Sequence, residues 1–194
     1  MKDSYPFYEL EAFPELIPLR DMWKEIRDEA LEHIDSFYTV GETIPDDRNT
    51  TGQWKMMPIK PATDDLTLDE HQGGDIAEKM ELWKDEFPKL RKICDSIDGN
   101  EYCLSLLGPG GHIAAHSHGR NRVSAVLGLD VPKLCYLRVD TKVRATENGK
   151  FNIFAFREKH EVWNGSDKGR LVLLISLPNR YNKSGFLNYI KEKE

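Results

Sequence analysis

The chain has 194 residues, of which 39% are hydrophobic and 31% are charged, and its formal net charge is -6. This length suits one domain with a buried core, and the acidic balance argues against a nucleic-acid partner, which would require Lys and Arg clustered on one face. Because no apolar run reaches the ~20 residues of a membrane helix and the first residues lack the apolar stretch of a signal peptide, we expect a single cytoplasmic domain over residues 1–194 with no membrane partner.

Residues 1–98 are predicted to be mainly helical and to pack on a β-rich core. Between Glu15 and Phe37, apolar residues recur every three or four positions, which is the pattern of an amphipathic helix. A polar, turn-rich segment follows over residues 41–52. The short apolar segment after it, around residues 54–59, is compatible with a strand.

A second helix is predicted from about Asp75 to Ile97. Its apolar positions again recur at helical spacing. Pro88 falls inside this range, so the segment is either one kinked helix or two shorter helices.

Residues 99–180 are predicted to form the β-rich core, and residues 181–194 a C-terminal surface helix. Short apolar runs alternate here with turn signals such as Asn148-Gly149 and Asn164-Gly165. Seven or eight short strands predict a sandwich or barrel with helices beside it, an α+β fold that is mainly β. The expected strands are Tyr102–Leu107, Ile113–His116, Val123–Leu129, Leu134–Val139, Phe151–Phe156, Glu161–Trp163 and Leu171–Leu177.

Three histidines of the β-rich part are candidate metal ligands. His116 and His118 are two residues apart, so a strand would direct both to one face, and His160 stands at another predicted strand. Two neighbouring ligands and one distant ligand are the usual way in which a barrel builds a metal site with open coordination positions. Imidazole suits Fe, Zn, Cu and Ni, so the ligands alone leave the metal open. The alternative is a histidine pair on a solvated strand that binds nothing.

Arg170 begins a segment that is apolar on both faces and is therefore expected to be buried. A buried cation requires an anionic partner. The sequence allows a structural ion pair with Asp or Glu, a strand-end position that reaches solvent, or a guanidinium fork that grips the carboxylate of a ligand.

Several segments between residues 50 and 177 carry a family pattern in their order and spacing: Trp54–Pro58, Phe87–Ile93, Gly111–Gly119, Val126–Pro132, and His160–Asn164 followed by Arg170. Together they resemble the aspartyl/asparaginyl β-hydroxylase family of Fe(II)- and 2-oxoglutarate-dependent oxygenases. The resemblance implies a double-stranded β-helix core of the jelly-roll or cupin-like type. It also implies that His116 and His160 bind the metal, that Arg170 binds the far carboxylate of 2-oxoglutarate, and that Arg138 lines the same cavity.

Two features depart from the family pattern. Many members carry a carboxylate two residues after the first histidine, and some carry Gly, whereas this chain has His118. We expect His118 to be a third neutral ligand, and the alternative is that it turns away and water takes its place. Ser124 and Val126 stand where other members carry an arginine and a histidine, so the cosubstrate pocket is altered. Trp163 is a further candidate for the pocket wall.

The resemblance implies hydroxylation of an unactivated C–H bond in an amino acid or another small or peptidyl substrate. Fe(II), O2 and 2-oxoglutarate would be required, succinate and CO2 would be released, and no catalytic residue is expected beyond the metal ligands. The histidine motif also resembles cupin motifs. That likeness leaves open a three-histidine enzyme, either a dioxygenase without 2-oxoglutarate or a Zn-dependent hydrolase or isomerase, and also a non-catalytic barrel that binds a metal or an anion. The sequence does not identify the substrate or the oligomeric state.

Overall fold

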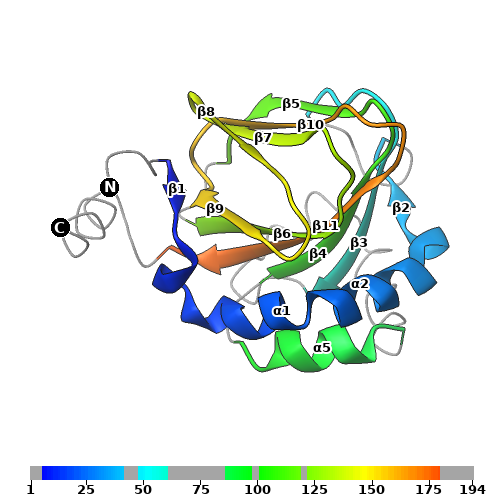
Figure 1. Cartoon of the computed structure of the whole chain (residues 1–194), viewed down its shortest axis with the longest axis vertical. Helices are drawn as coiled ribbons and strands as arrows, with labels where there is room; N and C mark the ends of the chain where they lie inside the picture. Colours follow the sequence, from blue (N-terminus) through cyan, green and yellow to red (C-terminus); the bar gives the residue numbers. More distant parts are fainter. Residues whose placement is uncertain (1–5, 42–47, 61–85, 98–100, 119–121, 180–194) are drawn as a thin grey trace.

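The computed structural model describes residues 6–41, 48–60, 86–97, 101–118 and 122–179. Two antiparallel sheets face each other, and helices cover the far side of the larger sheet (Figure 1). The expected C-terminal helix and residues 75–85 of the second predicted helix lie outside the described residues. No helix in the described ranges has the length and hydropathy needed to cross a bilayer.

The larger sheet has seven described strands, in the order β1 (Phe7–Tyr8), β9 (Phe151–Ala155), β6 (Arg122–Asp130), β11 (Arg170–Pro178), β4 (Glu101–Leu107), β3 (Trp54–Lys60) and β2 (Tyr38–Thr39). Side chains alternate between its two faces along each strand. In β11, Leu171 and Leu173 pack with the helices, whereas Val172 packs toward the smaller sheet.

The smaller sheet consists of β5 (His112–His116), β10 (His160–Asn164), β7 (Cys135–Val139) and β8 (Lys142–Ala145). The fold is therefore mainly β with flanking helices around a double-stranded β-helix core, which confirms the expected class. Three strands of the larger sheet precede residue 99, so the β core extends beyond the expected range of 99–180.

The N-terminal helical region is divided rather than continuous. It contains the 3-10 turns Leu10–Ala12, Pro14–Leu16 and Ile34–Ser36 and the helices α1 (Ile17–Asp21) and α2 (Trp23–Glu32). Met22 separates α1 from α2 because its backbone leaves the helical range, with φ of -101° and ψ of 17°. Pro88 is the first residue of α5 (Pro88–Asp95) and does not kink it. Backbone N–H groups in the first turn of a helix have no hydrogen-bond partner within the helix, so the N–H that proline lacks is not missed there.

The main hydrophobic core lies between these helices and the larger sheet. Its members come from α1, α2 and α5 on one side and from β4, β6 and β11 on the other. Among them are Leu19, Ile26, Leu90, Leu104, Leu127 and Leu173. This core fixes the larger sheet, whose other face is left to form a cavity with the smaller sheet.

Asn164 fixes the connection between β10 and β11. It is 1% exposed, and its amide donates hydrogen bonds to the carbonyl oxygens of Leu107, Gly108 and Lys168 at 2.9, 2.9 and 2.6 Å. The side-chain oxygen of Asn164 accepts a hydrogen bond from Ser166 Oγ at 2.7 Å. These hydrogen bonds fix the position of β10, which begins at His160, relative to β11, which begins at Arg170.

Glu29 of α2 caps the start of α5. The side chain is buried, and its two carboxylate oxygens accept hydrogen bonds from the backbone N–H groups of Lys89 and Leu90 at 3.0 and 2.9 Å. The N-cap residue of α5, Phe87, makes no side-chain hydrogen bond to these N–H groups. A carboxylate at a helix N-terminus also interacts favourably with the helix dipole.

We predict that Glu29→Ala lowers the free energy of unfolding by about 2 kcal/mol, because a hydrogen bond to a charged group contributes roughly 1.5–3 kcal/mol. Chemical denaturation measures this change. Glu25→Ala, at an exposed position of the same helix, is the matched control and should change stability by less than about 0.5 kcal/mol. Equal effects of the two substitutions would contradict the capping role.

Candidate metal centre

A cavity of about 190 Å³ lies between the two sheets. Both sheets line it, and its walls are largely apolar. The apolar lining includes Trp54, Met56, Ile113, Val126, Leu137, Phe154, Phe156, Val162 and Leu174, and the polar lining includes Arg48, Glu101, Ser105, His116, His118, Ser124, His160, Arg170 and Ser176. Three histidines and a buried arginine thus line one cavity.

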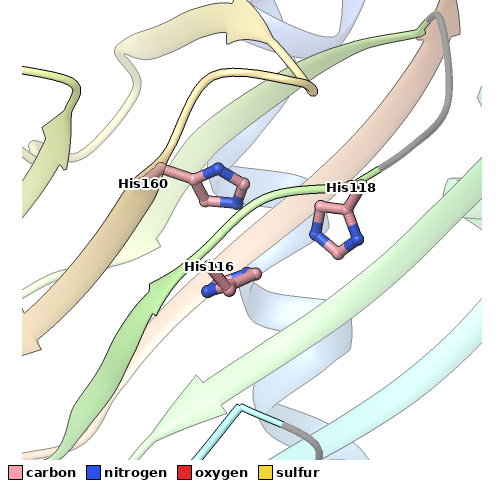
Figure 2. Close-up of side chains that lie close together, drawn as sticks. All are labelled: His116, His118 and His160. Carbon is pink, nitrogen blue, oxygen red and sulfur yellow. The ribbon is translucent and has the colours of Figure 1, made fainter.

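His116, His118 and His160 converge on one point of this cavity, as expected from the sequence (Figure 2). One ring nitrogen of each residue lies within 4.8 Å of the corresponding atoms of the other two. Three nitrogens spaced evenly around one ion at about 2.1 Å lie roughly 3.0–3.6 Å from one another. Rotation of the rings about their side-chain bonds would bring all three within reach of a single metal ion.

The register between β5 and β10 places two of these rings together. His116 is paired with His160, and Ile113 is paired with Val162. Between these two pairs β5 contains one more residue than β10, which is a β-bulge. Because of the bulge, His116 and Ile113 both face the cavity although they are three residues apart.

Backbone carbonyl groups orient two of the imidazole rings. His116 Nδ1 lies 2.8 Å from the carbonyl oxygen of Ala114, and His160 Nδ1 lies 2.7 Å from that of Glu158. A carbonyl oxygen only accepts, so each Nδ1 carries the proton, and in a neutral ring Nε2 is then the nitrogen that can coordinate a metal. A histidine that binds a metal through Nε2 has this Nδ1-protonated tautomer. In metal sites the tautomer is commonly fixed by a hydrogen bond from Nδ1 to a backbone carbonyl oxygen, as it is in these two residues.

His118 follows β5 and is held differently. Its ring stacks on Phe156, with centroids 4.0 Å apart and an interplanar angle of 14°. Its backbone N–H donates to the carbonyl oxygen of Phe156 at 3.1 Å. The aromatic contact keeps the ring on the cavity side, next to the other two histidines.

The cavity favours neutral imidazoles. Burial is the main cause that lowers the pKa of His118 to about 3, and electrostatic repulsion by His160 and Arg48 contributes to the same shift. Burial also lowers the pKa of His160 to about 4, although its hydrogen bond to the carbonyl of Glu158 acts in the opposite direction. Neutral rings with free lone pairs are the form that binds a divalent transition metal, so the donor set fits such an ion.

Arg170 lies in the same cavity and is 2% exposed. Its Nη2 donates to Thr146 Oγ1 at 3.4 Å, and its Nε has no hydrogen-bond partner. No Asp or Glu of the described ranges forms an ion pair with it, so the structural ion pair that the sequence allowed is not found there. Burial lowers the pKa of Arg170 to about 10, which still leaves the guanidinium charged at neutral pH. A buried cation that lacks a carboxylate partner and faces a cavity fits an anionic ligand.

A tight turn brings Thr146 to Arg170. Gly128 of β6 lies so close to this turn that a Cβ on it would come within 2.1 Å of the carbonyl oxygen of Glu147. Only glycine allows this approach. No sequence pattern indicated that Thr146 contacts Arg170, because Thr146 precedes an ordinary turn signal.

Two expected pocket residues lie elsewhere. Arg138 and Trp163 belong to strands that line the cavity, but their neighbours Leu137 and Val162 are the residues that face it. Alternation along a strand turns Arg138 and Trp163 to the opposite, outer face. The structure therefore places Arg138 and Trp163 outside the cavity lining in which they were expected, whereas Ser124 and Val126 do line the cavity.

Arg48 and Glu101 line the cavity without having been expected there. Arg48 lies in a segment whose polar composition indicated only a loop, and its guanidinium stacks 5.4 Å above the ring of Trp54. The indole N–H of Trp54 donates to Ser105 Oγ at 2.9 Å. No sequence pattern marks these residues, because loop and strand-end side chains reach the cavity only through the tertiary fold.

Comparisons with known proteins show what the chain is similar to. The chain is 28% identical over 177 residues to the aspartyl/asparaginyl beta-hydroxylase of Mus musculus, a match that covers 86% of this chain and 22% of that protein. It is 42% identical over 77 residues to the ornithine lipid ester-linked acyl 2-hydroxylase of Rhizobium tropici, covering 37% of this chain and 27% of that protein. The chain thus spans less than a third of the length of each relative.

A solved structure shares the fold. The prolyl-4-hydroxylase of Pseudomonas putida aligns with a TM-score of 0.53 and 19% identity, over 82% of this chain and 87% of that one. At this identity the likeness supports the double-stranded β-helix and no finer property. The sequence profile described as Aspartyl/Asparaginyl beta-hydroxylase matches residues 20–179, which is most of the chain. The chain therefore belongs to the aspartyl/asparaginyl beta-hydroxylase family.

Proposed function

We propose that the protein is a non-haem Fe(II)- and 2-oxoglutarate-dependent hydroxylase that acts on an amino acid or another small or peptidyl substrate. One observation carries the proposal: three histidines whose ring nitrogens lie close together and a buried arginine without a carboxylate partner in the described part of the chain line the same cavity. Family membership and the hydroxylases among the relatives support the reaction class.

Each residue has a distinct task in this proposal. His116, His118 and His160 hold the iron through their side-chain nitrogens, and Arg170 binds the far carboxylate of 2-oxoglutarate as a fork. When bound, the iron with 2-oxoglutarate and O2 supplies the oxidation, in which succinate and CO2 are released and a C–H bond is hydroxylated. The apolar walls, including Phe154 and Val162, exclude water from the reacting groups.

A three-histidine enzyme that works without 2-oxoglutarate is the competing hypothesis, because the site has three histidines and no carboxylate ligand in the described ranges. That hypothesis assigns no task to Arg170. A charged, fully buried side chain in the cavity wall is costly unless it binds an anion. This cost favours the proposal that includes 2-oxoglutarate.

We predict that the protein binds one equivalent of Fe(II) or Co(II), and that His116→Ala and His160→Ala weaken binding by more than the roughly 10- to 100-fold caused by loss of a supporting group around a metal site. If His118 is the third ligand, His118→Ala also weakens binding, and His118→Asp restores it because a carboxylate is the usual third ligand in such sites. Anaerobic metal titration measures these affinities. His33→Ala, outside the cavity, is the control, and wild-type affinity in His118→Ala would contradict its role as a ligand.

We predict that Arg170→Lys weakens 2-oxoglutarate binding to the metal-loaded protein by at least about 10-fold, since a hydrogen bond to a charged group contributes roughly 1.5–3 kcal/mol and Lys lacks the planar fork. Anaerobic calorimetry measures binding without turnover. Arg144→Lys, at a half-buried position on β8, should bind 2-oxoglutarate as the wild type does. Unchanged affinity in Arg170→Lys and in Arg170→Ala would remove the cosubstrate from the proposal.

A further inference from the structure

The outer face of the smaller sheet carries a set of interacting side chains directly behind the metal centre. Glu161 lies between His160 and Val162 in the sequence but points away from the cavity. Its carboxylate accepts a hydrogen bond from His112 Nε2 on β5 at 3.3 Å and is ion-paired with Arg138 on β7. One side chain of β10 thereby joins both neighbouring strands.

Two further contacts complete this set. The rings of His112 and Trp163 are stacked, with centroids 5.2 Å apart and an interplanar angle of 1°. Arg138 Nη1 donates to the carbonyl oxygen of Asp140 at 3.1 Å, which connects the group to the turn between β7 and β8. We call His112, Arg138, Glu161 and Trp163 the outer-face network.

The network spans the bulge in the pairing of β5 with β10. Between the His116–His160 pair and the Ile113–Val162 pair, Ala114 and Ala115 face the single residue Glu161. A bulge interrupts the ladder of hydrogen bonds. A slip of one residue in β5 would turn His116 from the cavity to the outer face, so the register of this strand determines whether the metal site exists.

His112 is the only member of the network on β5, and it is held in two ways. Its ring stacks on Trp163, and its Nε2 binds Glu161. The two contacts reach β10 on either side of Val162, the residue that faces the cavity. Since His112 and His116 lie on the same short strand, fixing the first limits the positions that the second can take.

We propose that the outer-face network is a positioning device that holds His116 and His160 at the separation required by the metal. Resting on the proposed metal centre, the inference assigns to Glu161, His112, Arg138 and Trp163 a role in metal binding although none of them lines the cavity. They act through the backbones of β5 and β10.

Co(II) titration of the purified chain tests the proposal, because Co(II) reports both affinity and ligand geometry through its visible absorption. Glu161→Ala should weaken Co(II) binding by about 10- to 100-fold, the usual effect of losing a group that supports metal ligands, and should change the absorption spectrum of the bound ion. Glu161→Gln keeps one acceptor oxygen and should recover part of the affinity. Lys142→Ala, exposed on β8, should match the wild type.

Thermal unfolding of the metal-free protein separates positioning from simple stabilisation. The proposal is wrong if Glu161→Ala lowers the metal-free unfolding temperature while Co(II) affinity and spectrum stay unchanged, or if no measured quantity changes. Should Glu161→Ala fail to fold, His112→Phe decides, because Phe keeps the stacking on Trp163 and removes only the hydrogen bond to Glu161; unchanged Co(II) affinity in that variant would overturn the proposal. A wild-type protein that does not bind Co(II) would instead contradict the metal centre itself.

Discussion

The antiparallel pairing of β5 with β10 is the constraint on which the candidate site depends. It sets His116 opposite His160, and the bulge within it turns both His116 and Ile113 toward the cavity. Carbonyl oxygens of the same two chain segments then fix the ring tautomers. His118 reaches the same point from the segment after β5 and is held by Phe156 rather than by a strand. The candidate metal centre therefore depends on the backbone register of β5 and β10, because the register decides whether the histidine side chains face one another.

The larger sheet supplies the other half of the site. Its helix-facing residues form the main core, so its position is fixed independently of any ligand. Its cavity-facing residues include Arg170, a cation that folding buries without a carboxylate partner among the described residues. Burial without compensation is expensive, and folded proteins keep such groups chiefly where function requires them. The cavity therefore has three histidines on one side and a buried guanidinium on the other, which is the pairing that the proposed metal-chelating dicarboxylate would need.

Much of this arrangement could be predicted from the sequence, and the errors have physical causes. The strands from β3 to β11 were predicted from apolar runs and turn signals, with the exception of β8. This strand lies at a sheet edge and carries exposed Lys142 and Val143, so its sequence lacks an alternating pattern. The three histidines and Arg170 were found through motif spacing. Arg138 and Trp163 were misplaced because a family resemblance does not determine the phase of strand alternation. Arg48 reaches the cavity, and Thr146 reaches Arg170, only through tertiary contacts, for which a single sequence holds no pattern.

The outward turn of Arg138 and Trp163 is informative in itself, since both join Glu161 and His112 behind the metal ligands. One face of the smaller sheet carries the candidate metal ligands, and the other carries the side chains that we propose to position them. The central claim is that the histidines and Arg170 serve one cofactor pair, and anaerobic visible spectroscopy tests it most directly. Adding 2-oxoglutarate to the Fe(II)-loaded protein should produce a metal-to-ligand charge-transfer band that His160→Ala abolishes. Absence of the band in a wild-type protein with bound Fe(II) would contradict the account.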